Sequence, residues 1–251
     1  MACTRDQLRE FLDALLHPTA YTDYCPNGLQ VEGKSQIKHL VTGVTASQAL
    51  VDAAIADEAD AILVHHGYFW RSEDPCVVGM KAQRLRALLA AEISLFAYHL
   101  PLDCHQELGN NVTLGRLIGV SDPLPLVAGD ANLPLYTGRL PAAIQVEQLA
   151  NKMAAVLERE PLVIGEGAVQ KLVWCTGAVQ GYIDRAADAG ADVFITGEIS
   201  EQTVHVARER GVAFIAAGHH ATERYGVQAV GERVASVLGC THRFVDSPNP
   251  A

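Results

Sequence analysis

The sequence predicts an α/β protein made of two similar halves, and three observations lead to this prediction. Short apolar runs alternate with helical patterns, the same order of elements returns after residue 170, and polar residues follow several of the apolar runs. Alternating strands and helices are typical of a largely parallel sheet covered by helices. With 251 residues and 49% hydrophobic composition, the chain can bury one large core or two smaller ones.

The first half begins with an amphipathic helix. Thr4 and Gln7 have the spacing of a capping box, and apolar residues from Leu8 to Leu16 then recur at helical period. This helix is expected to end near Pro18, before a loop that contains Pro26, Asn27 and Gly28. The patterns that follow predict strand 40–44, helix 48–57, strand 61–64, helix 83–91 and strand 93–98.

The second half repeats this order as strand 172–176, helix 182–189, strand 193–196, helix 203–210 and strand 213–217. When residues 39–66 are aligned without gaps on the residues 132 positions later, eight of the 28 aligned pairs are identical. A shift of 120 positions aligns His99 with His219 and Asp103 with Glu223. Ala and Asp are common between helices and strands, so chance is one explanation of the first match. An internal duplication of two βαβ units explains both matches.

The segment between the halves has a different composition. Residues 121–142 contain four prolines, which break helices, and residues 143–158 have a helical pattern. We therefore divide the chain into a first α/β half with its N-terminal helix, a bridging segment with one helix and one or two strands, and a second α/β half. Their ranges are 1–120, 121–170 and 171–251.

The bulk composition limits partners and location. A net charge of −10 argues against binding nucleic acid through the general field of the protein, because such binding depends on Lys and Arg. The six cysteines include no CxxC pair, which favours reduced thiols. The first residues lack the apolar run of a signal peptide, and no stretch is long enough for a membrane span. These features predict a cytoplasmic protein without membrane contact.

Polar residues follow three predicted strands, at the edge where parallel sheets carry their functional groups. They are His65 and His66, then His99 and Asp103, then His219 and Glu223. Successive side chains of a strand point in opposite directions, so His65 and His66 suit two neighbouring ions better than one. His219 and Glu223, four residues apart, can face one side, and a carboxylate with two oxygens can bridge two ions.

Histidine and carboxylate ligands suit zinc, manganese, iron, nickel or cobalt better than calcium or magnesium. The metal ligands predicted on this basis are His65, His66, Asp103, His219 and Glu223. A histidine at a strand end is more often a hydrogen-bonded structural or surface residue, but matching polar ends in both halves favour metal binding. His99, Glu198 and His220 form a second group of candidates, each of which could be a general acid or base or a hydrogen-bonding partner.

These residues resemble a known family, the Ngg-interacting-factor-like proteins. It includes bacterial YbgI-like members commonly labelled GTP cyclohydrolase 1 type 2 homologues. The resemblance spans essentially the whole chain. It rests on Asn27 to Val31, His65-His66-Gly67, His99 to Asp103, Thr196-Gly197-Glu198, Gly218 to Arg224 and Asp246 to Pro250. The run His99-Leu100-Pro101-Leu102-Asp103 departs from the usual His-Thr-Asn-Leu-Asp of the family.

The resemblance implies two α/β domains that face each other across a dinuclear metal site, in subunits assembled as a hexamer. It also implies that His65 and Asp103 bind one ion, that His66 and His219 bind the other, and that Glu223 bridges them. The leading function is a metal-dependent hydrolase of an unknown small-molecule substrate, in which one ion lowers the pKa of a bound water and the other polarises an electrophile. The alternative is a non-enzymatic metal-binding or regulatory scaffold, including one linked to DNA repair.

Overall fold

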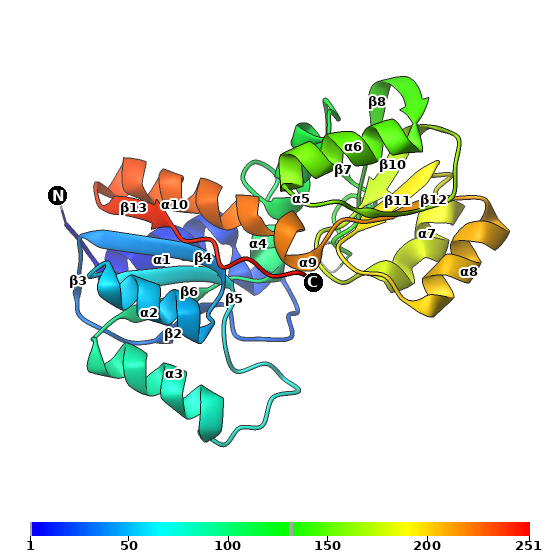
Figure 1. The fold of residues 1–251 in the computed structure, drawn as a ribbon. Coiled ribbons are helices and arrows are strands. Elements are labelled where there is room, and N and C mark those ends of the chain that lie inside the picture. Colours follow the sequence, from blue (N-terminus) through cyan, green and yellow to red (C-terminus); the bar gives the residue numbers. More distant parts are fainter. Residues whose placement is uncertain (1, 131–132) are drawn as a thin grey trace. The chain divides into compact units, whose positions relative to one another are not determined.

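The computed structural model describes residues 2–130 and 133–251, and these form two compact α/β units (Figure 1). The first unit holds the chain up to Leu102 together with Gly226–Ser247, and the second holds Asp103–Tyr225 with Pro248–Ala251. None of the helices in these described ranges has the combination of length and apolar character that crossing a bilayer requires.

The first unit is built on a five-stranded sheet of order β13-β4-β5-β6-β2, in which only β2 runs antiparallel to its neighbour. Its strands are β2 (Gly28–Val31), β4 (His39–Thr45), β5 (Ala61–His66), β6 (Ser94–Ala97) and β13 (Thr241–Phe244). Two short strands, β1 (Cys3–Thr4) and β3 (Gln36–Ile37), pair separately. Its helices are α1 (Arg5–Leu16), α2 (Gln48–Ala56), α3 (Gly79–Ala90), the start of α4 (Leu100–Cys104) and most of α10 (Arg224–Leu238).

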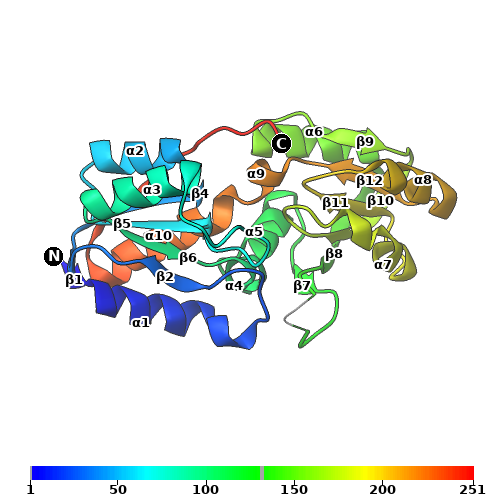
Figure 2. The same ribbon diagram turned by 90° about the horizontal axis from the view of Figure 1, so that it is seen from below.

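Helices cover both faces of this sheet, with α2 and α3 on one face and α1 and α10 on the other (Figure 2). Val41, Ile62 and Leu95 pack into one core with Leu50 of α2 and Leu88 of α3. The alternating neighbours on the same strands are equally buried, which is the pattern of a parallel sheet with two covered faces.

The second unit is built on a six-stranded sheet of order β7-β8-β10-β11-β12-β9, with β10, β11 and β12 parallel. Its strands are β7 (Leu124–Pro125), β8 (Tyr136–Gln145), β9 (Leu162–Ile164), β10 (Ala168–Trp174), β11 (Val193–Thr196) and β12 (Ala213–Ala216). Its helices are α5 (Asn110–Leu117), α6 (Val146–Leu157), α7 (Ile183–Asp188), α8 (Glu201–Arg210) and α9 (His219–Thr222). The core clusters place α5 and α6 on one face of the sheet and α7 and α8 on the other.

The central elements of the two units follow the same order, β4-α2-β5-α3-β6 and β10-α7-β11-α8-β12. An aspartate has the same role in each. Oδ2 of Asp60 accepts hydrogen bonds from the backbone N–H groups of Lys38 and His39, and Oδ2 of Asp192 accepts them from Gln170 and Lys171. The six residues correspond under the shift of 132 positions found in the sequence.

The predicted elements of both halves are present, and the capping box of Thr4 and Gln7 is confirmed at the start of α1. Several features differ from the expectation. Residues 121–170 hold one helix but three complete strands where one or two were expected, β2 begins at Gly28 where a loop was expected, and α5, α10 and β13 were not predicted. The short strands β2 and β13 are defined less by local periodicity than by their partners β6 and β4 in the sheet.

Candidate functional site

Three of the candidate histidines lie together in the first unit, at the carboxyl ends of neighbouring parallel strands. His65 and His66 are the last residues of β5, and His99 lies two residues beyond β6. The ring centroids of His65 and His66 are 4.5 Å apart, and that of His99 lies 4.9 Å from His65. One ring nitrogen of each lies within 4.8 Å of the others, so these three imidazoles form a possible ligand group.

Each of these rings uses its Nδ1 for a hydrogen bond to the protein. Nδ1 of His65 lies 3.1 Å from the carbonyl oxygen of Tyr98, and Nδ1 of His66 lies 3.1 Å from Oγ1 of Thr45. Nδ1 of His99 lies 2.7 Å from Oδ1 of Asp23. A hydrogen bond from Nδ1 orients an imidazole and makes Nε2 the nitrogen suited to a metal or a proton.

Asp23 and Asn27 position the backbone that carries His99, and the pattern of candidate ligands in the sequence did not include Asp23. Oδ1 of Asn27 accepts a hydrogen bond from the backbone N–H of His99, and Asp23 accepts one from Leu100. Burial opposes ionisation of Asp23. The hydrogen bond and charge of His99, together with hydrogen bonds from Asn27 and the backbone of Leu100, outweigh this effect and lower the pKa of Asp23 to about 2. The only signal in the sequence was the Asn27 motif four residues later.

A second group of candidates lies in the second unit. Asp103, in α4, and Glu223, between α9 and α10, are both buried and each offers a carboxylate oxygen, the two within 4.8 Å of each other. Nε2 of His219 lies 3.3 Å from Oε2 of Glu223. Oδ1 of Asp103 accepts hydrogen bonds from Nδ2 of Asn110 and Oγ1 of Thr176, which fix its orientation.

His219 follows the same pattern as His65, His66 and His99, because its Nδ1 lies 2.7 Å from Oε1 of Glu198. Burial alone would lower the pKa of His219, but hydrogen bonds and charge from Glu223 and Glu198 outweigh it and raise this pKa to about 9. A histidine between two carboxylates therefore carries a proton at neutral pH that a bound cation would replace.

Two glycines make room for His219 and Glu223. A Cβ on Gly177 would lie 2.4 Å from Oε1 of Glu223, and a Cβ on Gly197 would lie 2.6 Å from the Cα of His219. Both glycines follow the carboxyl ends of parallel strands, β10 and β11. The sequence offered no sign of these close approaches.

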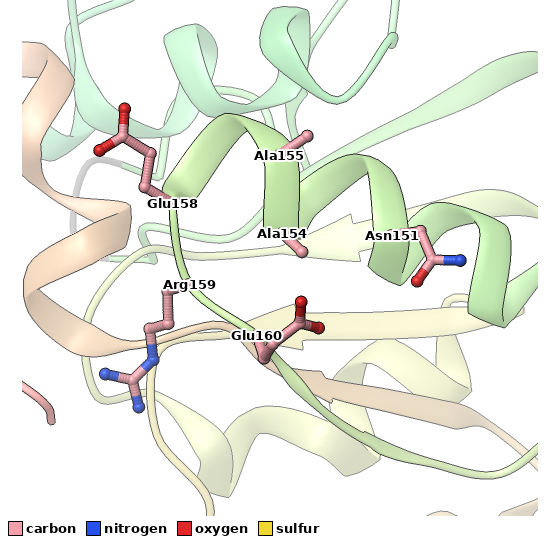
Figure 3. Close-up of a pocket in the computed structure, with 6 residues that line it drawn as sticks. All are labelled: Asn151, Ala154, Ala155, Glu158, Arg159 and Glu160. Carbon is pink, nitrogen blue, oxygen red and sulfur yellow. The ribbon is translucent and has the colours of Figure 1, made fainter.

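The last candidate, His220, is the second residue of α9 and is buried. A hollow of about 440 Å³ lies elsewhere in this unit, at the end of α6, and Arg159 lines it with five neighbours (Figure 3). The close-up shows Glu158 and Arg159 pointing to different sides of this helix end. The residues that line this hollow include none of the candidates, so its size alone does not make it the functional site.

Comparison with known proteins decides the family. The model of Duf34/NIF3 (NGG1p interacting factor 3) matches residues 3–250. The chain belongs to the Duf34/NIF3 family. It is 53% identical, over the full length of both chains, to a Pseudomonas aeruginosa protein named GTP cyclohydrolase 1 type 2 homolog.

Solved structures of Duf34/NIF3 relatives have the same fold. One described as protein ybgI, of unknown function, is 47% identical with a TM-score of 0.94 and covers 99% of this chain and 100% of that one. Another, TTHA1606 from Thermus thermophilus, is 35% identical with a TM-score of 0.90 and the same coverage. The mixed α/β fold expected from the sequence and the resemblance to this family are thus confirmed.

Proposed function

We propose that this Duf34/NIF3 protein binds two divalent transition-metal ions per chain and uses them as a hydrolase of a small-molecule substrate. The observation that carries the proposal is the orientation of the histidines. His65, His66 and His219 each direct Nδ1 to a hydrogen-bonding partner in their own unit. Histidine ligands of metals almost always have such a partner on their second nitrogen.

The donor set fits zinc, manganese, iron, nickel or cobalt. In the proposed centre His65 and Asp103 would hold one ion, His66 and His219 would hold the other, and Glu223 would be shared between the two ions. The proximity of Asp103 and Glu223 within the second unit supports this assignment, because two buried carboxylates that close repel each other unless a cation or proton intervenes.

When bound, such ions supply Lewis acidity and a more acidic water, which is what hydrolysis of an ester, amide or phosphoester requires. The protein itself would supply the proton transfers, and His99, Glu198 and His220 are the proposed groups. A proton acceptor or donor in this role contributes about 10²- to 10⁴-fold to the rate. The five proposed ligands and these three residues would together make the active site.

The hydrolase proposal is tested by separating activity from metal content. A screen of phosphoesters and cyclic amides across the five metals identifies a substrate, after which His99→Ala, Glu198→Gln and His220→Ala are assayed. We expect about two ions in each variant and a roughly 10²- to 10⁴-fold slower turnover in at least one. Full activity in all three, or no hydrolysis in the screen, would instead favour a non-enzymatic metal-binding scaffold.

Metal affinity is expected to fall as the pH decreases. His219, with its pKa raised to about 9, must lose its proton to bind a metal, and the other ligand imidazoles must also be neutral. Each displaced proton reduces apparent affinity by about tenfold per pH unit below the pKa. Competition with a chelator at several pH values from about 7.5 to about 5.5 measures this slope, and a flat profile would contradict histidine ligation.

We further propose a symmetric homohexamer, as the resemblance to the family implies, and a location in the cytoplasm, where the thiols of its cysteines would stay reduced. Light scattering at micromolar concentration is expected to give a mass about six times the 26.9 kDa of one chain. A mass near that of the single chain would contradict this prediction.

We also infer that an internal duplication produced the two units. The equivalent roles of Asp60 and Asp192 support this origin, since they preserve a specific side-chain contact at the same position of the repeat. Their backbone N–H groups also match, donating to the carbonyl oxygens of His39 and Lys171 respectively. The division into 1–120, 121–170 and 171–251 remains a prediction about the extent of each copy.

A further inference from the structure

His99 differs from the adjacent His65 and His66 in the group that holds its Nδ1. A backbone carbonyl oxygen and a hydroxyl face Nδ1 of His65 and His66, whereas a carboxylate, that of Asp23, faces Nδ1 of His99 at 2.7 Å. A charged acceptor makes a shorter and stronger hydrogen bond than a neutral one. The proton on Nδ1 is therefore held most firmly in His99.

The carboxylate of Asp23 is itself held in place. Its side chain is only 3% exposed, and it accepts hydrogen bonds from Nδ2 of Asn27 at 2.9 Å and from the backbone N–H of Leu100 at 2.9 Å. On another side, the ring of Trp70 lies nearly perpendicular to that of His99, with centroids 5.0 Å apart. These contacts limit rotation of the imidazole.

We propose that Asp23 is a positioning residue that fixes His99 in the Nδ1–H tautomer, so that an unprotonated Nε2 is presented beside His65 and His66. This inference rests on the proposed function, in which His99 moves a proton to or from the substrate. The proton taken from an acidic group of the substrate would reside on Nε2, and Asp23 would stay ionised beside the resulting imidazolium. In this role Asp23 touches no substrate and acts only through His99.

The first test is the tautomer of His99 in the metal-free protein. Nitrogen-15 NMR of histidine-labelled protein, with His99 assigned by its loss in His99→Gln, is expected to show Nδ1 protonated and Nε2 unprotonated. The Nε2–H tautomer in the wild-type protein would overturn the proposal. A further ion held by Asp23, Cys25 and His99, seen as metal bound beyond two per chain and lost in Asp23→Asn, would also overturn it.

The second test compares two aspartates that hold neighbouring residues. Asp23→Asn replaces the charged acceptor, and we expect its His99 signals to shift toward the other tautomer and turnover to fall about 10- to 100-fold with an unchanged KM. The control is Asp13→Asn, because Asp13 accepts a hydrogen bond from the hydroxyl of Tyr98, the residue before His99. This control is expected to leave the tautomer unchanged.

Unchanged His99 signals in a folded Asp23→Asn protein would overturn the proposal. The wild-type spectrum still decides it if that variant does not fold. Because the tautomer is read without metal or substrate, failure of this inference is distinguishable from failure of the hydrolase proposal, which is decided by metal content and turnover.

Discussion

Replacing Glu223 by Ala is expected to reduce the metal content from about two ions per chain to nearly none. In the proposed centre this carboxylate alone contacts both ions, and removing it also leaves His219 without one of the two acids that raise its pKa. Elemental analysis of protein reconstituted with one metal and then desalted measures the loss. Circular dichroism verifies that the variant is folded.

Two further variants make this result specific. His66→Ala is expected to weaken mainly one ion, because its imidazole is proposed to bind only one. Glu232→Ala, which removes an exposed carboxylate from α10, is expected to retain both ions. The bridging role of Glu223 is refuted if Glu223→Ala retains one tightly bound ion, or if Glu232→Ala loses metal equally.

Replacing Gly197 by Ala is expected to destabilise the second unit by about 3 kcal/mol. The added Cβ would meet backbone atoms, the Cα and N of His219 and the carbonyl oxygen of Gly177, at 2.6 to 2.7 Å. Backbone atoms cannot move aside as the end of a flexible side chain can. The added methyl group would therefore displace the start of α9, which includes His219. Urea unfolding of the metal-free protein measures the change in the free energy of unfolding.

Gly181→Ala is the matched control, because among the described residues other than its chain neighbours none has an atom within 4 Å of the position its Cβ would occupy. Its free energy of unfolding is expected to change by no more than about 0.5 kcal/mol. Equal stability of the two variants would show that the region around Gly197 can relax, and would remove the steric argument for this glycine.

The central strands and helices of both units could be predicted because each repeats one simple pattern. Strands such as β5 and β11 are continuous apolar runs that end in polar residues, and α1 combines a capping box with one apolar face. The polar residues at the end of β5 and after β6 and β12 could be found for the same reason. Periodicity and strand ends are local properties, and a single sequence records them directly.

The remaining elements depend on contacts that a single sequence does not record. Half of the residues of β8 are exposed, which blurs the alternation of apolar and polar residues. The strand β13 alternates only weakly, and its partner β4 lies about 200 residues earlier, as the hydrogen bond between Thr42 and His242 illustrates. Asp23, Gly177 and Gly197 are likewise defined by neighbours distant in the sequence.

The first unit includes residues 226–247, so its two parts of chain are separated by almost all of the second unit. A ribosome therefore completes the main stretch of the second unit before it synthesises α10 and β13. Domains usually fold in the order in which they emerge. Until β13 is synthesised, the sheet of the first unit lacks this edge strand. The backbone groups along one side of β4 are then exposed and can pair with strands of other chains. A chain truncated after Tyr225 would leave the first unit incomplete and prone to aggregate, while most of the second unit would be present.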